Sequence, residues 1–182
     1  MNLKELTWEN HKSAERKKFA GVLMSGSIDP ALYYKYLTNQ FYSYVALEYK
    51  LPLVLLSLVD IRRSNLMRDD LQELEELYGF VFEGSLLTKS TQEYITHCEE
   101  LYEKNPDGLI AHMYVRHFGD MYGGAIIKKC VPGKGSMYNF DNKEDLKLKV
   151  RAVLNDDMAD EANVCFQFAI RLFEELEDDC EG

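Results

Sequence analysis

Residues 107–130 predict a long helix whose middle contains three glycines, and this segment constrains the possible folds more than any other part of the chain. Apolar side chains recur at steps of three and four residues on either side of the glycines, which is typical of a helix. Each glycine lowers helix stability by about 0.5 to 1 kcal/mol relative to alanine, so Gly119, Gly123 and Gly124 together destabilise it by about 2 to 3 kcal/mol. A group that approaches the bare backbone must offset this loss.

Three arrangements would explain the glycines. A second helix would pack closely against a face of small residues. A phosphate-binding loop is disfavoured, because no strand pattern precedes the segment and the G-x-x-x-x-G-K-[ST] order is absent. The third arrangement is the close approach of a planar cofactor, with Asp120 at the edge of the bare face organising water. The segment by itself leaves the crossing helix and the cofactor open.

A candidate metal ligand lies near the amino terminus. Residues 3–15 have helical character, and His11 and Glu15 are four residues apart, so they lie on the same face. A carboxylate in this position can accept the proton of one imidazole nitrogen and leave the other nitrogen free to bind a metal. The same spacing is common in ordinary surface pairs, so it does not assign a site by itself.

Four separated motifs occur along the chain. The first is His-x-x-x-Glu at residues 11–15, and the second is Tyr-Val-Ala-Leu-Glu at residues 44–48. The third is Tyr-x-Arg-x-x-Gly-Asp-x-x-Gly-Gly at residues 114–124. The last combines Tyr-x-Phe-x-Asn at 138–142 with Leu-Phe-Glu-Glu-Leu at 172–176. In this order, and over most of its length, the chain resembles the heme oxygenase family.

The resemblance implies an all-α fold, in which residues 1–182 form one domain that holds heme between a proximal helix and a glycine-kinked distal helix. The implied activity is O2-dependent cleavage of heme b, both substrate and cofactor, to the alpha isomer of biliverdin, CO and Fe2+. Electrons are expected from ferredoxin or a flavin reductase, and a bilin reductase is expected as a downstream partner. A non-catalytic heme carrier or sensor is the alternative. A di-iron enzyme would need two Glu-x-x-His motifs, which the chain lacks.

The resemblance also implies roles for individual residues. His11 corresponds to the axial ligand of the heme iron, and Glu15 would orient its ring. Backbone at Gly119 and Gly123 would approach the heme, while Asp120 would hold a water network that supplies protons. Tyr44 and Arg116 match family residues in that network, and the expected heme-binding residues are Lys4, Tyr114, Gly124, Lys147, Arg151 and Phe166.

Two departures from the family pattern occur in the last third of the chain. The segment between Asn155 and Phe166 is shorter than in the family, which makes the alignment of Lys147 and Arg151 less direct. Ala169 stands where some members have an asparagine in the distal network.

The net charge of −10 argues against nucleic-acid binding, since like charges repel. An acidic electron donor would also be repelled, so the heme oxygenase interpretation requires a local basic patch. The candidates for this patch are residues 16–18, residues 128–129, Lys134 and residues 143–151.

Other features place the chain in the cytoplasm as a soluble protein. The longest apolar stretch, residues 51–59, is interrupted by Pro52 and is too short to span a membrane. The amino terminus begins with a charged amphipathic helix rather than a signal peptide. The four cysteines are far apart in sequence, which favours reduced thiols over a disulfide framework or a zinc site. Among the histidines, His112 is expected to be packed or hydrogen-bonded, and His97 to lie at the surface.

Helices are predicted along almost the whole chain, and no segment predicts a strand. Asp29 and Pro30 form a start signal for a helix that extends to about residue 51. Ser90, followed by Glu93, predicts a capping box at the start of another helix. Besides the glycine segment, the expected helices are 3–15, 30–51, 65–78, 90–104, 143–154 and 160–179.

Overall fold

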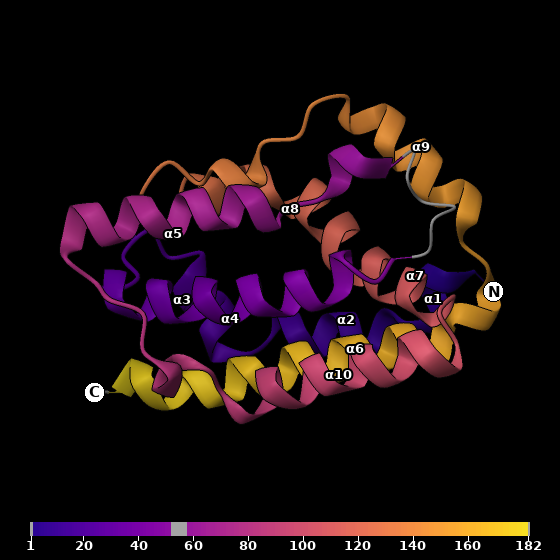
Figure 1. The fold of residues 1–182 in the computed structure, drawn as a ribbon, viewed down its shortest axis with the longest axis horizontal. Helices are drawn as coiled ribbons and strands as arrows, with labels where there is room; N and C mark the ends of the chain where they lie inside the picture. Colours follow the sequence, from indigo (N-terminus) through magenta and orange to yellow (C-terminus); the bar gives the residue numbers. More distant parts are fainter. Residues whose placement is uncertain (1, 52–57, 182) are drawn as a thin grey trace.

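The computed structural model describes residues 2–51 and 58–181, and within these residues it contains helices and no strand (Figure 1). An all-α fold was expected from the sequence, and it is confirmed. The α-helices are α1 (Leu3–Leu6), α2 (Trp8–Glu15), α3 (Lys18–Leu23), α4 (Pro30–Glu48), α5 (Ser64–Tyr78), α6 (Lys89–Lys104), α7 (Gly108–Met113), α8 (Gly119–Lys128), α9 (Lys143–Val153) and α10 (Ala159–Glu177).

The long helices stack in layers. Helices α6 and α10 run side by side, α4 lies against α6, and α5 covers the opposite side of α4 (Figure 1). Helix α10 also contacts α2, α3 and α7, so the end of the chain packs against its beginning and its middle. The proximal candidate helix α2 and the distal segment α7–α8 are therefore both positioned by α10.

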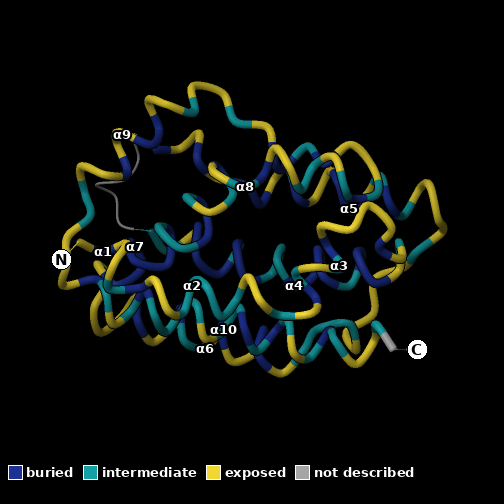
Figure 2. The backbone as a smooth tube through the Cα atoms, turned by 180° about the vertical axis from the view of Figure 1, so that it is seen from behind, coloured by how far each residue is buried: buried dark blue, intermediate teal, exposed yellow. Residues whose placement is uncertain are grey.

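Buried apolar side chains form three clusters along the inner faces of these helices (Figure 2). One joins α3, α4, α5 and α10; a second joins α1, α7, α8 and α9; a third joins α4, α6, α7 and α10. Helices α5, α6 and α9 bury one face, as the periodic apolar pattern predicts, whereas α7 is buried at every residue. Among the described residues, no helix has both the length and the apolar character needed to cross a membrane.

The first predicted helix is divided in two at Thr7. Asn2 and Glu5 form a capping box that starts α1. The buried hydroxyl of Thr7 donates to the carbonyl oxygen of Leu3 at 2.9 Å, a local bond that competes with the helical pattern. Thr7 is therefore both the C-cap of α1 and the residue before α2 begins at Trp8.

The start of α6 differs from the prediction. Thr88, not Ser90, is the N-cap, and its side chain accepts a hydrogen bond from the backbone N–H of Thr91. Ser90 is two residues further along, where its backbone N–H donates to Glu175 of α10 at 3.1 Å. The capping-box prediction was wrong because this serine bonds to another helix.

Other boundaries agree closely with the sequence. Asp29 and Pro30 start α4 as predicted, although the Asp29 side chain makes no capping bond, and α4 ends at Glu48. Residues 52–57, within the predicted apolar stretch, lie outside the described part of the chain. The predicted helices near 65–78, 143–154 and 160–179 are confirmed, whereas α3 was not expected.

The glycine segment is not one uniform α-helix. Between α7 and α8, residues Tyr114–Phe118 form a π-helical turn, and Gly119 follows it directly. The glycines themselves lie in regular α-helix, and the irregular backbone ends immediately before the first of them. Single π-helical turns occur often at functional sites, because the extra residue displaces the neighbouring side chains around the helix.

Candidate active site

His11 is held on α2 by groups around its ring. Its Nε2 lies 2.9 Å from a carboxylate oxygen of Glu15, so the predicted pair is present. The Trp8 ring stacks on it with 5.5 Å between centroids, and Phe166 of α10 meets its edge at 5.8 Å. The His11 side chain remains 42% exposed, which leaves it accessible to a ligand. Because Nε2 faces Glu15, ligation through Nε2 would require the ring to turn over.

Gly119 and Gly123 present an open face on the distal helix. A Cβ atom built on either glycine would have no other atom within 4 Å, apart from its own helix backbone and chain neighbours. Gly124 is different, because a Cβ there would lie 2.9 Å from Cδ1 of Tyr138. The first two glycines therefore leave a bare surface, while the third permits close packing of Tyr138 on the helix. Close packing therefore explains Gly124, whereas no described side chain covers the face at Gly119 and Gly123.

Asp120 lies beside this open face and is bound to Tyr44 of α4. The Tyr44 hydroxyl donates to Oδ2 of Asp120 at 2.5 Å. Burial raises the pKa of the Asp120 carboxyl from 3.8 to about 6, against the opposing effects of the Tyr44 hydrogen bond and of the nearby charges on His117, Arg63 and Arg116. Asp120 therefore titrates close to neutral pH and can both release and accept a proton there.

Arg116 is buried behind this pair rather than bonded to it. Its Nε donates to the hydroxyl of Tyr94 on α6 at 3.1 Å, and one terminal nitrogen donates to Gln40 at 3.3 Å. Its guanidinium also lies over the Tyr94 ring, 4.2 Å from the ring centre. The cation is thus fixed by α4 and α6, and its charge acts on Asp120 through space.

Glu48 and His117 form a buried hydrogen-bonded pair that the sequence did not predict. His117 Nε2 lies 2.6 Å from Oε2 of Glu48, and the His117 ring contacts the Tyr44 ring at 4.9 Å. The Glu48 carboxylate also accepts the backbone N–H groups of Arg63 and Ser64 at the start of α5. Within the described residues, Nδ1 of His117 is buried and has no hydrogen-bond partner. A water or ligand atom at this position would satisfy it.

A row of aromatic rings lies along the distal helix. Tyr114 contacts Phe118 at 5.6 Å, and Phe118 contacts Tyr122 at 4.9 Å. Helix α9 places two cations on this row: Lys147 Nζ lies 4.1 Å from the centre of the Tyr122 ring, and the Arg151 guanidinium lies over Phe118 and bonds the Tyr122 hydroxyl. Phe118 and Tyr122 were not predicted, although their spacing of four residues is a helical signal.

The predicted residues fall into three groups. The first group lies at the distal helix and contains Tyr44, Gly119, Gly123 and Asp120, with Arg116 behind them. The second group lies at α2 and contains His11, Glu15 and Phe166. The third group contains Lys147 and Arg151, which contact the aromatic row that includes Tyr114. Lys4 is exposed on α1, and its side chain has no partner among residues 2–51 and 58–181. Gly124 faces Tyr138 instead of the open side.

The sequence of the chain is similar to known proteins over nearly its full length. The sequence model of the family described as Heme oxygenase matches residues 1–175. The heme oxygenase of Guillardia theta is 29% identical over 205 aligned residues, covering 97% of this chain and 85% of that protein. Heme oxygenase 1 of Synechocystis sp. is 28% identical, covering 96% of this chain and 83% of that protein.

Solved structures show the same similarity. The heme oxygenase of Leptospira interrogans superposes with a TM-score of 0.82 at 29% identity, covering 95% of this chain and 97% of that chain. Heme oxygenase-1 of Synechocystis sp. PCC6803, solved in complex with heme, superposes with a TM-score of 0.83 at 25% identity, covering 97% and 91%.

Proposed function

The chain belongs to the heme oxygenase family, and on that premise we propose that it cleaves heme with O2 to biliverdin, CO and Fe2+. One observation carries this proposal. An open glycine face on a helix lies beside a carboxyl group whose pKa is about 6 and which a tyrosine holds in place. A flat macrocycle can approach such a backbone closely, and a carboxyl group with this pKa can supply protons near neutral pH.

The residues of the proposed pocket suit heme in their chemistry. His11 is a half-exposed imidazole with aromatic neighbours, and we assign it as the iron ligand, with Glu15 orienting the ring. Gly119 and Gly123 would lie against the opposite face of the macrocycle. Phe166 would add an apolar wall, since it already contacts the edge of His11.

When heme is bound, its iron activates oxygen and its porphyrin edge is oxidised. The protein must then deliver protons and keep bulk water out. We propose that Asp120 holds a water in the pocket and passes a proton through it, while Tyr44 fixes the carboxyl orientation. Arg116 would favour the ionised carboxylate after proton transfer, because its charge lowers the pKa of Asp120. Nδ1 of His117 is a further buried polar atom without a partner among the described residues, and a second water would satisfy it.

The remaining predicted residues would orient the substrate. Heme carries two propionates, and we propose that Lys147, Arg151 and Lys4 bind them, with the Tyr114 hydroxyl as a further donor. Lys147 is bonded to Glu144 at 3.0 Å in this structure and would exchange that partner for a propionate. Gly124 would act indirectly by letting Tyr138 pack on the helix. This orientation, with α8 as a wall, would direct oxidation to the alpha position.

The test is to mix the purified chain with hemin and a reductant in air and follow the visible spectrum. Loss of the Soret band with appearance of biliverdin is the expected result. A stable heme spectrum would instead assign the chain as a carrier or sensor, and no binding would exclude both functions. His11→Ala should lose turnover and regain part of it with added imidazole. Full activity of His11→Ala without imidazole would contradict the assignment of the ligand.

We propose ferredoxin, an acidic protein, as the electron donor, with a flavin reductase as the alternative. On this chain, the surface that binds the donor would consist of Lys128, Lys129 and Lys134, which form no ion pair within the described residues. The loop after α8 folds back on that helix, since a Cβ on Gly135 would lie 3.0 Å from Cγ of Lys128. By contrast, Lys17 and Lys149, from the other predicted basic segments, are paired with Glu174 and Asp145.

Charge reversal tests this surface. Lys129→Glu together with Lys134→Glu should raise the KM for ferredoxin, and the difference from the parent should shrink at high salt. The control is Lys104→Glu, an equally exposed lysine at the end of α6. Equal KM values for the double variant and the control would exclude this surface.

Three further assignments rest on the same premise. We propose that residues 1–182 act as one domain, because α10 packs against helices from the beginning and the middle of the chain. We propose a cytoplasmic location, since Cys98, Cys130, Cys165 and Cys180 are free thiols. A bilin reductase would then be the partner that takes up the product.

A further inference from the structure

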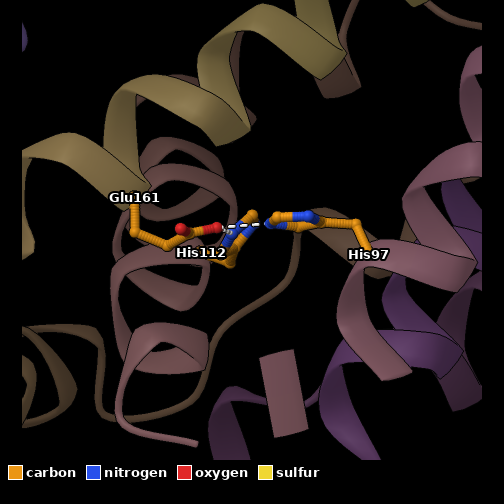
Figure 3. A group of neighbouring side chains, drawn as sticks. All are labelled: His97, His112 and Glu161. Carbon is orange, nitrogen blue, oxygen red and sulfur yellow. Dashed lines mark hydrogen bonds and ion pairs between the residues drawn. The ribbon is translucent and has the colours of Figure 1, made fainter. Parts of the chain in front are cut away.

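Three side chains outside the proposed heme pocket converge on one point. His97 extends from α6, His112 from α7 and Glu161 from α10 (Figure 3). Nε2 of His97 lies 2.5 Å from Oε1 of Glu161, and Nε2 of His112 lies 2.6 Å from the same oxygen. All three ligand atoms lie within 4.8 Å of one another. His97 is therefore part of a cluster and is not the simple surface residue expected from the sequence.

The second nitrogen of His112 is already engaged. Its Nδ1 lies 2.8 Å from the hydroxyl of Tyr94, which also accepts a hydrogen bond from Arg116. This contact fixes the ring of a fully buried histidine and directs Nε2 toward Glu161. Metal-binding histidines usually have such a partner on the nitrogen that does not bind the metal, because it holds the ring in position.

The cluster is also accessible from solvent. The side chains of His97 and Glu161 are 27% and 23% exposed. His97 lines a surface cavity of about 490 Å³, together with Phe168, Glu93 and Glu100. Glu93 is paired with Lys89 and Arg171, so Glu100 is the carboxylate of this cavity that has no ion pair among the described residues. A metal ion can therefore reach the cluster without passing through the proposed heme pocket.

We propose that His97, His112 and Glu161 form a binding site for Zn2+ or a similar divalent transition metal. Two imidazoles and one carboxylate are a common zinc ligand set, in which a water from the cavity completes a tetrahedron. Tetrahedral Zn2+ with bonds of about 2.0 to 2.2 Å separates its ligand atoms by about 3.3 to 3.5 Å. The present separations of 2.5 and 2.6 Å are those of hydrogen bonds, so the side chains must move apart by less than about 1 Å.

The bound metal would connect three helices. Helices α6, α7 and α10 each supply one ligand, and α7 leads directly into the π-helical turn that contains Arg116. Metal binding should therefore stabilise the folded chain, because the unfolded chain does not hold the three ligands together. This inference does not depend on the proposed function, since none of the three residues is assigned to the heme pocket.

The experiment is a zinc titration of the purified chain of residues 1–182 at pH 8, in competition with a chromophoric chelator. One equivalent of Zn2+ should bind to the parent protein and raise its Tm. His97→Ala and Glu161→Gln should each weaken binding by about tenfold or more and abolish the increase in Tm. Both positions are partly exposed, so these variants should fold, and circular dichroism checks that they do.

The control is Glu100→Gln, which removes a carboxylate from the same cavity but leaves the cluster intact, so its zinc affinity should stay within about twofold of the parent. Undiminished zinc affinity in His97→Ala would overturn the proposal. Co2+ substitution gives a second readout. A four-coordinate spectrum without thiolate charge-transfer bands supports the site, whereas such bands would assign the metal to cysteines and overturn it.

Discussion

The hydroxyl of Tyr44 donates a hydrogen bond to Oδ2 of Asp120 across 2.5 Å, which joins α4 to the second residue of α8. The two residues are 76 positions apart in sequence and belong to different motifs. Without Tyr44, the Asp120 carboxyl would lose its hydrogen-bond donor among the described residues. This pair is therefore the most direct place to test the proposed proton supply.

Removing the hydroxyl should reduce turnover more than binding. Tyr44→Phe keeps the ring but deletes the donor, and we expect kcat to fall by about tenfold to a hundredfold. The heme affinity should stay within about threefold, because no contact to the proposed heme face is lost. The Tyr44 hydrogen bond lowers the pKa of Asp120, so the pH profile of kcat should move to higher pH in the variant. An unchanged profile would argue against proton delivery by Asp120.

The titration of Asp120 should also appear in the stability of the heme-free protein. Its pKa is raised from 3.8 to about 6, so the folded state binds more protons than the unfolded state in this range. The contribution of Asp120 to the free energy of unfolding is thus present below pH 4 and is lost as the pH rises through 6. Relative to Asp120→Asn, the free energy of unfolding of the parent should fall by up to about 3 kcal/mol as the pH rises from about 4 to above 6.

Urea unfolding at a series of pH values measures this difference. Tyr44, Arg116, His117 and Arg63 are the titratable or charged groups that act on Asp120 from α4, the π-helical turn and the segment before α5. They are present in both proteins, so the comparison isolates the titration of Asp120 together with its coupling to these groups. If the free energies of unfolding of parent and variant differed by the same amount at every pH, Asp120 would not titrate in this range.

Adjacent glycines on α8 should respond in opposite ways to the same substitution. Gly123→Ala places its methyl group in open space and should stabilise the heme-free protein by about 0.5 to 1 kcal/mol. Gly124→Ala forces a methyl group to within 2.9 Å of Tyr138 and should destabilise it by about 1 to 3 kcal/mol. Thermal unfolding measures both effects.

Hemin titration completes the test of the glycine face. Gly123→Ala should weaken heme binding although it stabilises the protein, because the methyl group occupies the face that the ring would approach. If Gly123→Ala bound heme as tightly as the parent, the macrocycle would not lie against that face.

The buried pair of Glu48 and His117 should be important for stability. Glu48→Gln keeps the shape but removes the charge that accepts from His117, Arg63 and Ser64, and we expect a loss of about 2 to 4 kcal/mol in the free energy of unfolding. Glu76→Gln, at an exposed site on α5, is the matched control and should change stability by less than about 0.5 kcal/mol. Equal effects of the two variants would contradict this account.

The sequence predicted the helices and several contacts of the site, since these follow from local patterns. The spacing of His11 and Glu15 within one helix determines that their side chains can meet, and the structure has that pair. The glycine pattern predicted a bare face, but it did not separate the open side at Gly123 from the packed side at Gly124. That distinction depends on Tyr138, which lies on a different segment.

Long-range polar contacts were the main features that the sequence could not supply. Glu48 and His117 each lie in a recognised motif, yet nothing in their spacing of 69 residues indicates a buried hydrogen bond between them. The π-helical turn at Tyr114–Phe118 has no local signal either, because its residues are compatible with an ordinary α-helix. Two hydroxyl groups also caused errors in the predicted helix ends: Thr7 bonds the carbonyl oxygen of Leu3 within its own segment, and Ser90 bonds Glu175 of another helix.

The carboxylate of Glu48 connects two elements, because its oxygens bind both the His117 ring and the backbone N–H groups of Arg63 and Ser64 at the start of α5. If either the helix that carries His117 or the start of α5 opens, Glu48 loses a hydrogen-bond partner, so the local fluctuations of these two elements are coupled. The hydrogen-exchange rates of the Arg63 and Ser64 amides should therefore report on the state of the distal pocket, even though neither amide faces it.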